Sequence, residues 1–129
     1  MKRILLVDDN ESFRKPLGLA LQFAGYEVQT APEGGAAIRL YTENPFDLVI
    51  TDLVMPGKEG LETIIELHKI EPGLKIIAIS GGGRMNPGVY LPMAAHLGAV
   101  ATLAKPFTAK TILDLVAEQF CEPQPIPLH

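Results

Sequence analysis

The sequence predicts a single α/β domain in which a parallel sheet is covered by helices on both faces. Short apolar runs rich in branched residues alternate with longer segments of helical spacing, which is typical of successive βα units. The apolar runs show little alternation with polar residues, as expected for strands buried on both faces. With 129 residues, 47% of them hydrophobic, the chain is long enough to bury one core between two helical layers.

The first strand and the first helix come first in this pattern. The run Ile4-Leu5-Leu6-Val7 predicts a buried strand over residues 3–7. A helix is predicted over 10–24, because apolar residues recur there at helical spacing and Gly25 supplies a C-terminal stop. Pro16 lacks a backbone donor and would crowd the carbonyl of Ser12, so we expect either a kink or a later helix start.

The remaining elements alternate in the same way. Strands are predicted at 26–30, 47–51, 75–79 and 100–104, and helices at 33–43, 58–70, 88–97 and 108–121. Three of these strands carry largely apolar runs, at 48–50, 76–79 and 100–104. Thr108 is a good N-cap for the last helix, whose apolar residues share one side.

The last eight residues differ in composition from the rest of the chain. Proline alternates at positions 123, 125 and 127, which argues for an extended tail or a truncated linker rather than another element. We therefore expect one domain over residues 1–121 and a proline-rich segment over 122–129. The sequence contains no internal repeat and no segment typical of an output domain, so the expectation is a stand-alone domain.

The overall charge and the cysteine content exclude several classes of function. A formal charge of -4 gives no reason to expect nucleic acid or membrane as a direct partner, since both favour basic patches. The single cysteine, Cys121, excludes an internal disulfide framework. No signal-type segment is found at the start, so a cytoplasmic location is expected. The histidines at 68, 96 and 129 are predicted to be surface residues without a role in phosphotransfer.

Five polar residues are placed just after predicted strands: Asp8 and Asp9, Asp52, Ser80 and Lys105. In an open α/β sheet, ligands bind outside the carboxyl ends of the strands, so these side chains are expected to converge. Three carboxylates repel one another there, because like charges at about 4 Å cost several kcal/mol at a partly screened dielectric. Mg²⁺ relieves this repulsion and also prefers phosphate oxygens, so the pattern predicts a phosphoryl-binding site.

The remaining groups suit phosphoryl transfer to the protein itself. Lys105 supplies a fixed positive charge for a phosphoryl oxygen, and Ser80 supplies a hydroxyl donor. An aspartate carboxylate can form a covalent aspartyl phosphate, a reaction that needs alignment and charge neutralisation more than a strong base.

Three segments together resemble the receiver domain of two-component response regulators, over essentially residues 2–121. They are Ile4–Asp9 with its acidic pair, Asp47–Pro56 followed by Gly60, and Lys105-Pro106-Phe107 after Ser80. The resemblance implies a flavodoxin-like (βα)5 fold with strand order 2-1-3-4-5. It also implies a set of site residues: Asp52 as phosphoacceptor, Asp8, Asp9, Asp52 and the backbone carbonyl of Val54 around Mg²⁺, Ser80 as the switch hydroxyl, and Lys105 preceding a cis proline.

The same resemblance implies a signalling switch rather than a turnover enzyme. A sensor histidine kinase or a histidine phosphotransfer protein would be the phosphoryl donor. The surface formed by the fourth helix, fifth strand and fifth helix would bind a downstream protein, and a homodimer is left open.

Two features depart from the usual pattern of the family. Thr102 stands where receivers usually carry an aromatic residue that moves inward on phosphorylation. The stretch from Gly81 to Gly83 makes the connection to the fourth helix unusually glycine-rich, and glycine widens backbone freedom. We hypothesise that this loop and the fourth helix, with Tyr90, transmit the signal in place of the missing aromatic, against the alternative of a passive flexible connector.

Other functions remain open from the residues alone. A receiver-like module that signals without phosphorylation would keep the same fold. A haloacid-dehalogenase-like phosphatase also uses Asp, Mg²⁺, Ser or Thr and Lys, but its Asp-x-Asp spacing is missing from Asp8-Asp9-Asn10. A flavodoxin-type FMN site is disfavoured, because the acidic cluster repels an unneutralised phosphate.

Overall fold

The computed structural model describes residues 1–53, 60–80 and 87–121, with only the backbone described for 87–91. Within these residues, five parallel strands form one sheet in the order β2-β1-β3-β4-β5, which confirms the predicted strand order. The strands are β1 (Arg3–Val7), β2 (Glu27–Ala31), β3 (Leu48–Asp52), β4 (Lys75–Ser80) and β5 (Ala101–Ala104). The helices are α1 (Glu11–Phe23), α2 (Gly34–Glu43), α3 (Gly60–Ile70), α4 (Pro87–His96) and α5 (Ala109–Phe120).

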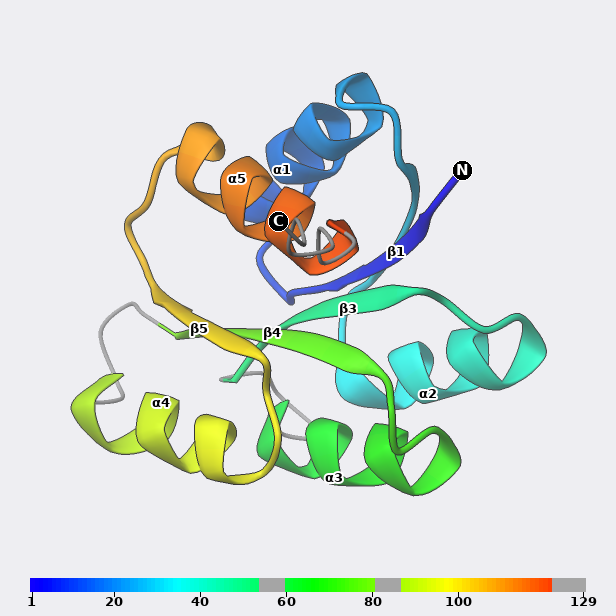
Figure 1. The fold of residues 1–129 in the computed structure, drawn as a ribbon, viewed down its shortest axis with the longest axis vertical. Helices are drawn as coiled ribbons and strands as arrows, with labels where there is room; N and C mark the ends of the chain where they lie inside the picture. The colour runs from blue at the N-terminus through cyan, green and yellow to red at the C-terminus, as the bar shows by residue number, and fades with distance from the viewer. Residues whose placement is uncertain (54–59, 81–86, 122–129) are drawn as a thin grey trace, which may run out of the picture.

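The helices form two layers, one on each face of the sheet. Helices α1 and α5 cover one face, and α2, α3 and α4 cover the other (Figure 1). Side chains alternate between the faces along each strand, so a single strand contributes side chains to both cores. In β1, Ile4 and Leu6 join the core beneath α1 and α5, whereas Leu5 and Val7 join the core beneath α2, α3 and α4.

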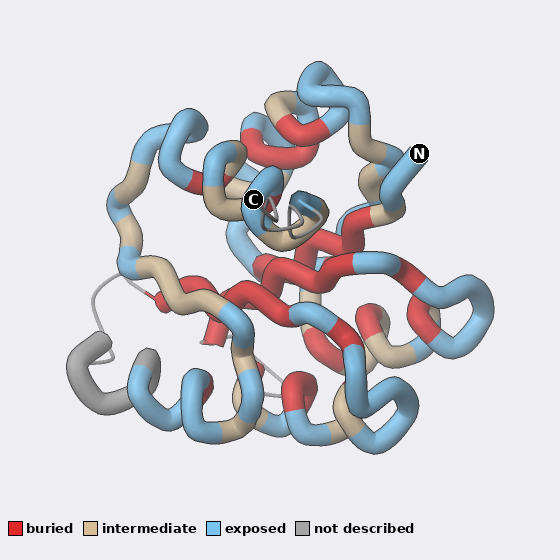
Figure 2. Tube along the Cα trace, viewed as in Figure 1, coloured by how far each residue is buried: buried red, intermediate tan, exposed pale blue. Residues whose placement is uncertain are grey.

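The central strands are buried and the edge strands are not. Every residue of β3 is buried, as are all residues of β4 after Lys75 (Figure 2). Strand β5 lies at one edge of the sheet and is only partly covered, and Val100 before it is 46% exposed. The expectation that 100–104 is a strand buried on both faces was therefore wrong, because an edge strand has a neighbour on one side only.

Helix α1 begins at Glu11 despite the proline inside it. The Asn10 side chain caps the helix by accepting a hydrogen bond from the Ser12 N–H at 3.0 Å. Pro16 lies within the helix, so the alternative of a later start was wrong. The predicted stop is confirmed, because Gly25 has a φ of 100°, a conformation that glycine adopts without the usual steric cost. Thr108 caps α5 as predicted, accepting from the Thr111 N–H.

The predicted element ends are shifted by one or two residues at several places. Asp52 and Ser80 are the last residues of β3 and β4, not the first residues after them. Asp8 and Lys105 do follow their strands directly. All four residues remain at the carboxyl ends of the strands, so the shift does not change which edge of the sheet they occupy.

His68 is not the free surface residue that the sequence predicted. Its ring is half-buried, with Nδ1 3.2 Å from the Leu97 carbonyl oxygen and Nε2 3.0 Å from that of Leu74. Gly98 packs against this ring, has a φ of 107°, and has no room for a Cβ. His68 therefore joins α3 to the segments before β4 and β5. His96 is exposed as predicted, and His129 lies outside the described residues.

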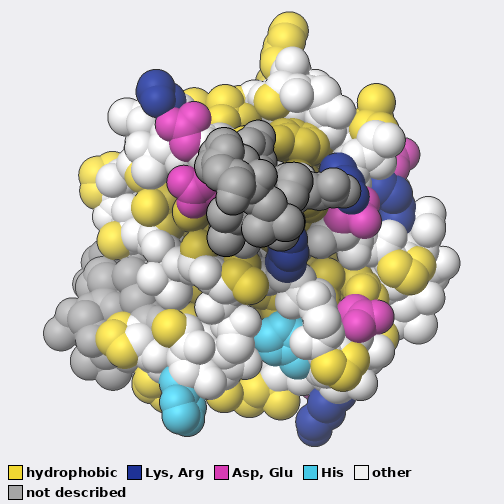
Figure 3. Space-filling view, viewed as in Figure 1, with side chains coloured by type: hydrophobic (Ala, Val, Ile, Leu, Met, Phe, Trp, Pro, Cys, Tyr) yellow, Lys and Arg dark blue, Asp and Glu magenta, His cyan; other side chains and the backbone are white. Residues whose placement is uncertain are grey.

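The surface carries mixed charges. Figure 3 shows acidic and basic side chains interspersed with apolar ones over the face it views, with no large patch of one sign. Across the described ranges, no helix has the length and apolar character needed to cross a membrane. Cys121 is exposed at the end of α5.

Tyr41 is expected to make the fold less stable at alkaline pH. Burial of its side chain, which is 4% exposed, raises its pKa above the usual 10.0, with smaller contributions from the carboxylates of Glu71 and Asp47. Above pH 10 the unfolded chain loses this proton first, so the unfolding free energy falls by at most about 1.4 kcal/mol per pH unit from this group. Urea unfolding between pH 8 and 11 should show a shallower decline for Tyr41→Phe than for the wild type. Equal declines would contradict this assignment.

Candidate functional site

The register of the sheet brings Asp8 and Asp52 side by side. Val7 of β1 pairs with Thr51 of β3, so the residues that follow them meet at the same edge. Both aspartates are almost fully buried, at 1% and 4% exposure. Asp9 is exposed, and one carboxylate oxygen from each of Asp8, Asp9 and Asp52 lies within 4.8 Å of the others. The acidic cluster predicted from the sequence is thus assembled in the fold.

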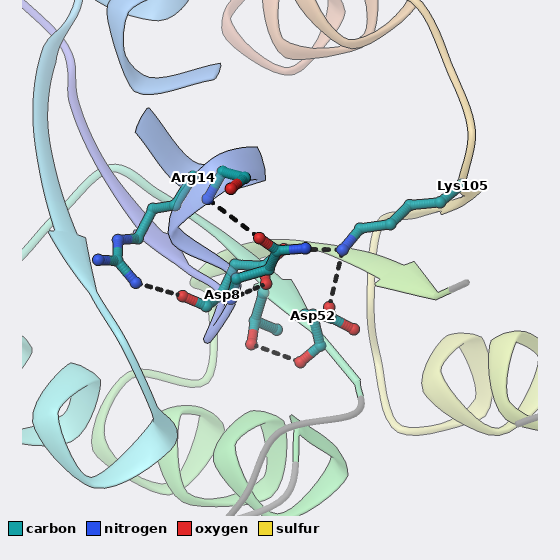
Figure 4. A network of polar contacts seen from close by, with 7 residues as sticks. Asp8, Arg14, Asp52 and Lys105 are labelled. Atoms are coloured by element: carbon teal, nitrogen blue, oxygen red, sulfur yellow. Dashed lines mark hydrogen bonds and ion pairs between the residues drawn. The ribbon is translucent and has the colours of Figure 1, made fainter. Parts of the chain in front are cut away.

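Lys105 reaches this cluster from the end of β5. Its Nζ donates to Asp8 Oδ2 at 2.9 Å and to Asp52 Oδ2 at 3.0 Å, so a single ammonium bridges two buried carboxylates (Figure 4). Burial alone lowers the pKa of Lys105, but hydrogen bonds and charge attraction from Asp8 and Asp52 outweigh it and raise the pKa above 10.5. The ammonium therefore stays protonated at physiological pH and is the internal counterion of the site.

The backbone around Asp8 is held by several contacts. Asp8 Oδ1 accepts from the Asn10 N–H at 2.9 Å, and the Asp8 N–H donates to the Ala31 carbonyl at 3.1 Å. The Arg14 guanidinium donates to the Asp8 carbonyl at 2.7 Å, as Figure 4 shows. Arg14 was not predicted as a residue of this site. In the sequence its only signal is its place one helical turn after Asn10, which does not say that its side chain faces the strand end.

Ser80 lies at the end of β4 beside the lysine. The Lys105 N–H donates to the Ser80 carbonyl at 2.7 Å, which joins the ends of β4 and β5. The Ser80 side chain is fully buried, and among the described residues its Oγ has no hydrogen-bond partner. A buried hydroxyl without a partner costs about 1–3 kcal/mol, so this orientation suits a group that gains a partner when another molecule or modification arrives.

The acidic cluster fits a hard divalent cation. Its ligands would be carboxylate oxygens that lie within 4.8 Å of one another, which is close to the limit of about 4.2 Å for two oxygens bound to one Mg²⁺. A cation there competes with Lys105 for Asp8 and Asp52. The Ser80 hydroxyl, for which the described part of the chain supplies no hydrogen-bond partner, is a donor suited to an anionic ligand of such a cation.

Several predicted features fall outside the described part of the chain. Val54, whose carbonyl was expected to bind the metal, lies there, as do the glycines at 81–83. The side chain of Tyr90 is also not described. Thr102 is half-buried on β5, where it pairs with Ala78. The cis bond expected between Lys105 and Pro106 is present.

Gly60 lies against the end of β3 with no room for a side chain. A Cβ at this position would overlap the Asp52 carbonyl oxygen and lie 2.5 Å from the Leu53 Cα. The Gly60 N–H also donates to the Leu53 carbonyl at 3.3 Å. Because the clash would be with backbone, no side-chain rotation can relieve it. The first residue of α3 thus approaches the backbone of Asp52 directly.

Gly60→Ala is expected to destabilise the fold by about 1–3 kcal/mol, because the new methyl group must displace the backbone at Asp52. Gly18→Ala is the matched control, since its Cβ would meet Thr30 Cγ2 at an ordinary 3.7 Å and alanine favours the helix. Chemical denaturation of both variants checks this. Equal stability of the two variants would show that the close approach at Gly60 is unimportant.

Comparison with known proteins shows which family this fold and this site belong to. The family model for the response regulator receiver domain matches residues 4–117, which include all the site residues above and, apart from Arg3 at the start of β1, the five described strands. The chain is 37% identical over 116 residues to the response regulator receiver protein CpdR of Brucella abortus, covering 88% of this chain and 92% of that protein. It is also 37% identical over 113 residues to the DNA-binding transcriptional regulator NtrC of Azospirillum brasilense, but spans only 23% of that longer protein.

Solved structures show the same fold. The crystal structure of a response regulator receiver domain protein from Clostridium thermocellum superposes with a TM-score of 0.84 at 30% identity, covering 92% of this chain and 94% of that one. The family match covers most of the chain. It agrees with the strand order of the sheet and with the acidic cluster at its edge. The chain belongs to the receiver domain family of two-component response regulators.

Proposed function

We propose that this receiver domain is a phosphorylation switch in which Asp52 accepts a phosphoryl group. The observation that carries this proposal is the single ammonium of Lys105 held between two buried carboxylates at the carboxyl ends of the strands. An Asp52 carboxylate oxygen forms a bond to phosphorus while the bond from phosphorus to the donor breaks, and the electron pair leaves with the donor atom. A phosphohistidine on a sensor kinase or a phosphotransfer protein is the proposed donor.

The surrounding residues have separate roles in this proposal. Asp8, Asp9 and Asp52 would hold Mg²⁺, which when bound neutralises charge on the phosphoryl oxygens. Lys105 holds another phosphoryl oxygen by charge-assisted hydrogen bonding. The buried Ser80 hydroxyl, which has no partner among the described residues, donates to a phosphoryl oxygen and so couples its arrival to the end of β4. Val54 remains the proposed backbone ligand.

The proposed output is a change in the surface made by α4, β5 and α5. Strand β5 joins this surface to the site, because Lys105 directly follows its last residue, Ala104. A downstream protein is the proposed partner, and self-association through this surface is a further outcome to measure. We propose residues 1–121 as the functional domain, 122–129 as a tail or linker, and the cytoplasm as the location.

Intact-protein mass spectrometry after incubation with acetyl phosphate tests the proposal. We expect the mass of one phosphoryl group to be added with Mg²⁺ present and to be absent when a chelator removes it. The adduct should be lost on treatment with neutral hydroxylamine, which attacks the carbonyl of an acyl phosphate and displaces phosphate, whereas a phosphoserine would survive. If Mg²⁺ binding is demonstrated and no adduct forms with acetyl phosphate or a phosphorylated kinase, the fold signals without phosphorylation. Turnover of small phosphate esters would instead support a phosphatase.

A further inference from the structure

The Lys105 ammonium has a third neighbour besides its two carboxylates. Its Nζ lies 4.0 Å from the centroid of the Phe13 ring, over the ring face. An ammonium has three N–H donors, and the bonds to Asp8 and Asp52 use two of them. The negative face of an aromatic ring attracts a cation, and more strongly where water is partly excluded, as it is around a lysine that is 17% exposed.

The Phe13 ring is itself held in place from two sides. Phe13 is the third residue of α1, where its N–H donates to the Asn10 carbonyl at 3.1 Å. Its ring meets Phe107 edge to face, with centroids 5.5 Å apart and an interplanar angle of 89°. Phe107 lies two residues after Lys105, so the ring contacts both ends of the segment that carries the lysine. This arrangement fixes where the ammonium lies relative to the carboxylates.

A lysine needs such a fixed contact because its four-carbon stem is flexible and its three donors can rotate. When Asp52 carries a phosphoryl group, the hydrogen bond from Lys105 to that carboxylate has to be replaced. The ring contact does not involve either carboxylate, so we expect it to persist while the oxygens around Nζ change. It also leaves the lysine charge undiminished, because the ring accepts no proton.

We propose that Phe13 is a positioning residue that holds the Lys105 ammonium at the phosphoacceptor. This inference rests on the proposed function, because the role is defined for phosphoryl transfer to Asp52. The ring acts through Lys105 and touches no reacting atom. Leucine at this position would fill much of the space but offer no negative ring face, whereas tyrosine would keep the face.

The first test is the rate of adduct formation with acetyl phosphate and Mg²⁺ at matched protein and donor concentrations. Phe13→Leu is expected to be slowed about 3- to 10-fold, the size of one cation–π contact. Phe13→Tyr should stay within about twofold of the wild type, since its ring keeps the attraction. Phe23→Leu is the matched control on the same helix, because Phe23 is 91% exposed, and its rate should not change.

The second test is an NMR signature of the position of the Lys105 side chain over the Phe13 ring. Protons above an aromatic face are shifted upfield, so the ε-methylene of Lys105, assigned by its disappearance in Lys105→Met, should lie upfield of the other lysines. The shift should vanish in Phe13→Leu and persist in Phe13→Tyr. It can be read in the wild type even if Phe13→Leu does not fold.

The outcomes separate this inference from the proposed function. The inference is overturned if the ε-methylene of Lys105 has an ordinary chemical shift in the wild type. It is also overturned if Phe13→Leu forms the adduct at the wild-type rate. Neither result affects Asp52 as the proposed acceptor. Equal slowing of the leucine and tyrosine variants also overturns it, because that pattern indicates packing. Absence of any adduct in the wild type overturns the proposed function and this role with it.

Discussion

Asp52→Asn is expected to abolish the phosphoryl adduct completely while the protein remains folded. The amide cannot replace the carboxylate as nucleophile, and the other aspartate of the buried pair, Asp8, is already hydrogen-bonded to Lys105 and to the Asn10 N–H. The fold should survive because asparagine has nearly the same shape and its oxygen still accepts from Lys105. Intact mass after acetyl phosphate treatment measures the first expectation, and urea unfolding measures the second.

The stability of Asp52→Asn has a definite expected sign. In the wild type two buried carboxylates share one ammonium, so the variant removes a like-charge repulsion and leaves Asp8 paired one to one with Lys105. We therefore expect an unfolding free energy no lower than that of the wild type. Asp114→Asn, on the exposed face of α5, is the matched control and should form the adduct normally. An adduct that persists in Asp52→Asn would place the acceptor elsewhere.

The convergence of the site could be predicted because it follows from a rule about strand ends. Parallel strands in register bring their carboxyl ends together, so Asp8, Asp52 and Lys105 had to meet once their strands were recognised. An error of one residue in the ends of β3 and β4 did not matter, since the edge of the sheet stayed the same. The strand order itself came from the family resemblance, because the apolar runs alone do not say which strands are neighbours.

Contacts between distant side chains could not be predicted in this way. Phe13 has the spacing of an ordinary core residue of α1, and nothing in that spacing says that its ring faces Lys105. His68 was predicted to be a surface residue. Its partners are the backbone carbonyls of Leu74 and Leu97, and every residue has such a carbonyl, so the sequence does not reveal these contacts. The exposure of β5 likewise depends on its place at the sheet edge, which a single apolar run does not reveal.

Lys105→Met is expected to destabilise the fold strongly at neutral pH. It removes the ammonium that bridges Asp8 and Asp52, whose side chains are only 1% and 5% exposed, and leaves them facing each other without their internal counterion. Breaking a buried ion pair lowers the free energy of unfolding by about 3–5 kcal/mol. Because Lys105 is partly exposed, we expect a loss at the lower end, about 3 kcal/mol. Methionine keeps most of the apolar stem, so lost charge rather than lost packing accounts for the change.

Mg²⁺ should reverse much of this loss, and that reversal is the more informative measurement. In the wild type a cation must compete with the ammonium for Asp8 and Asp52, whereas in Lys105→Met that competition is removed. At about 100 times its dissociation constant, a ligand that binds only the folded state stabilises it by about 2.7 kcal/mol. Urea unfolding with and without Mg²⁺ should therefore show a larger stabilisation in the variant than in the wild type at the same concentration.

Lys110→Met, on the exposed face of α5, should respond to Mg²⁺ as the wild type does. If Mg²⁺ stabilised Lys105→Met no more than the wild type, the lysine would not be the counterion that a metal replaces, and the acidic cluster would have to be charge-balanced in another way.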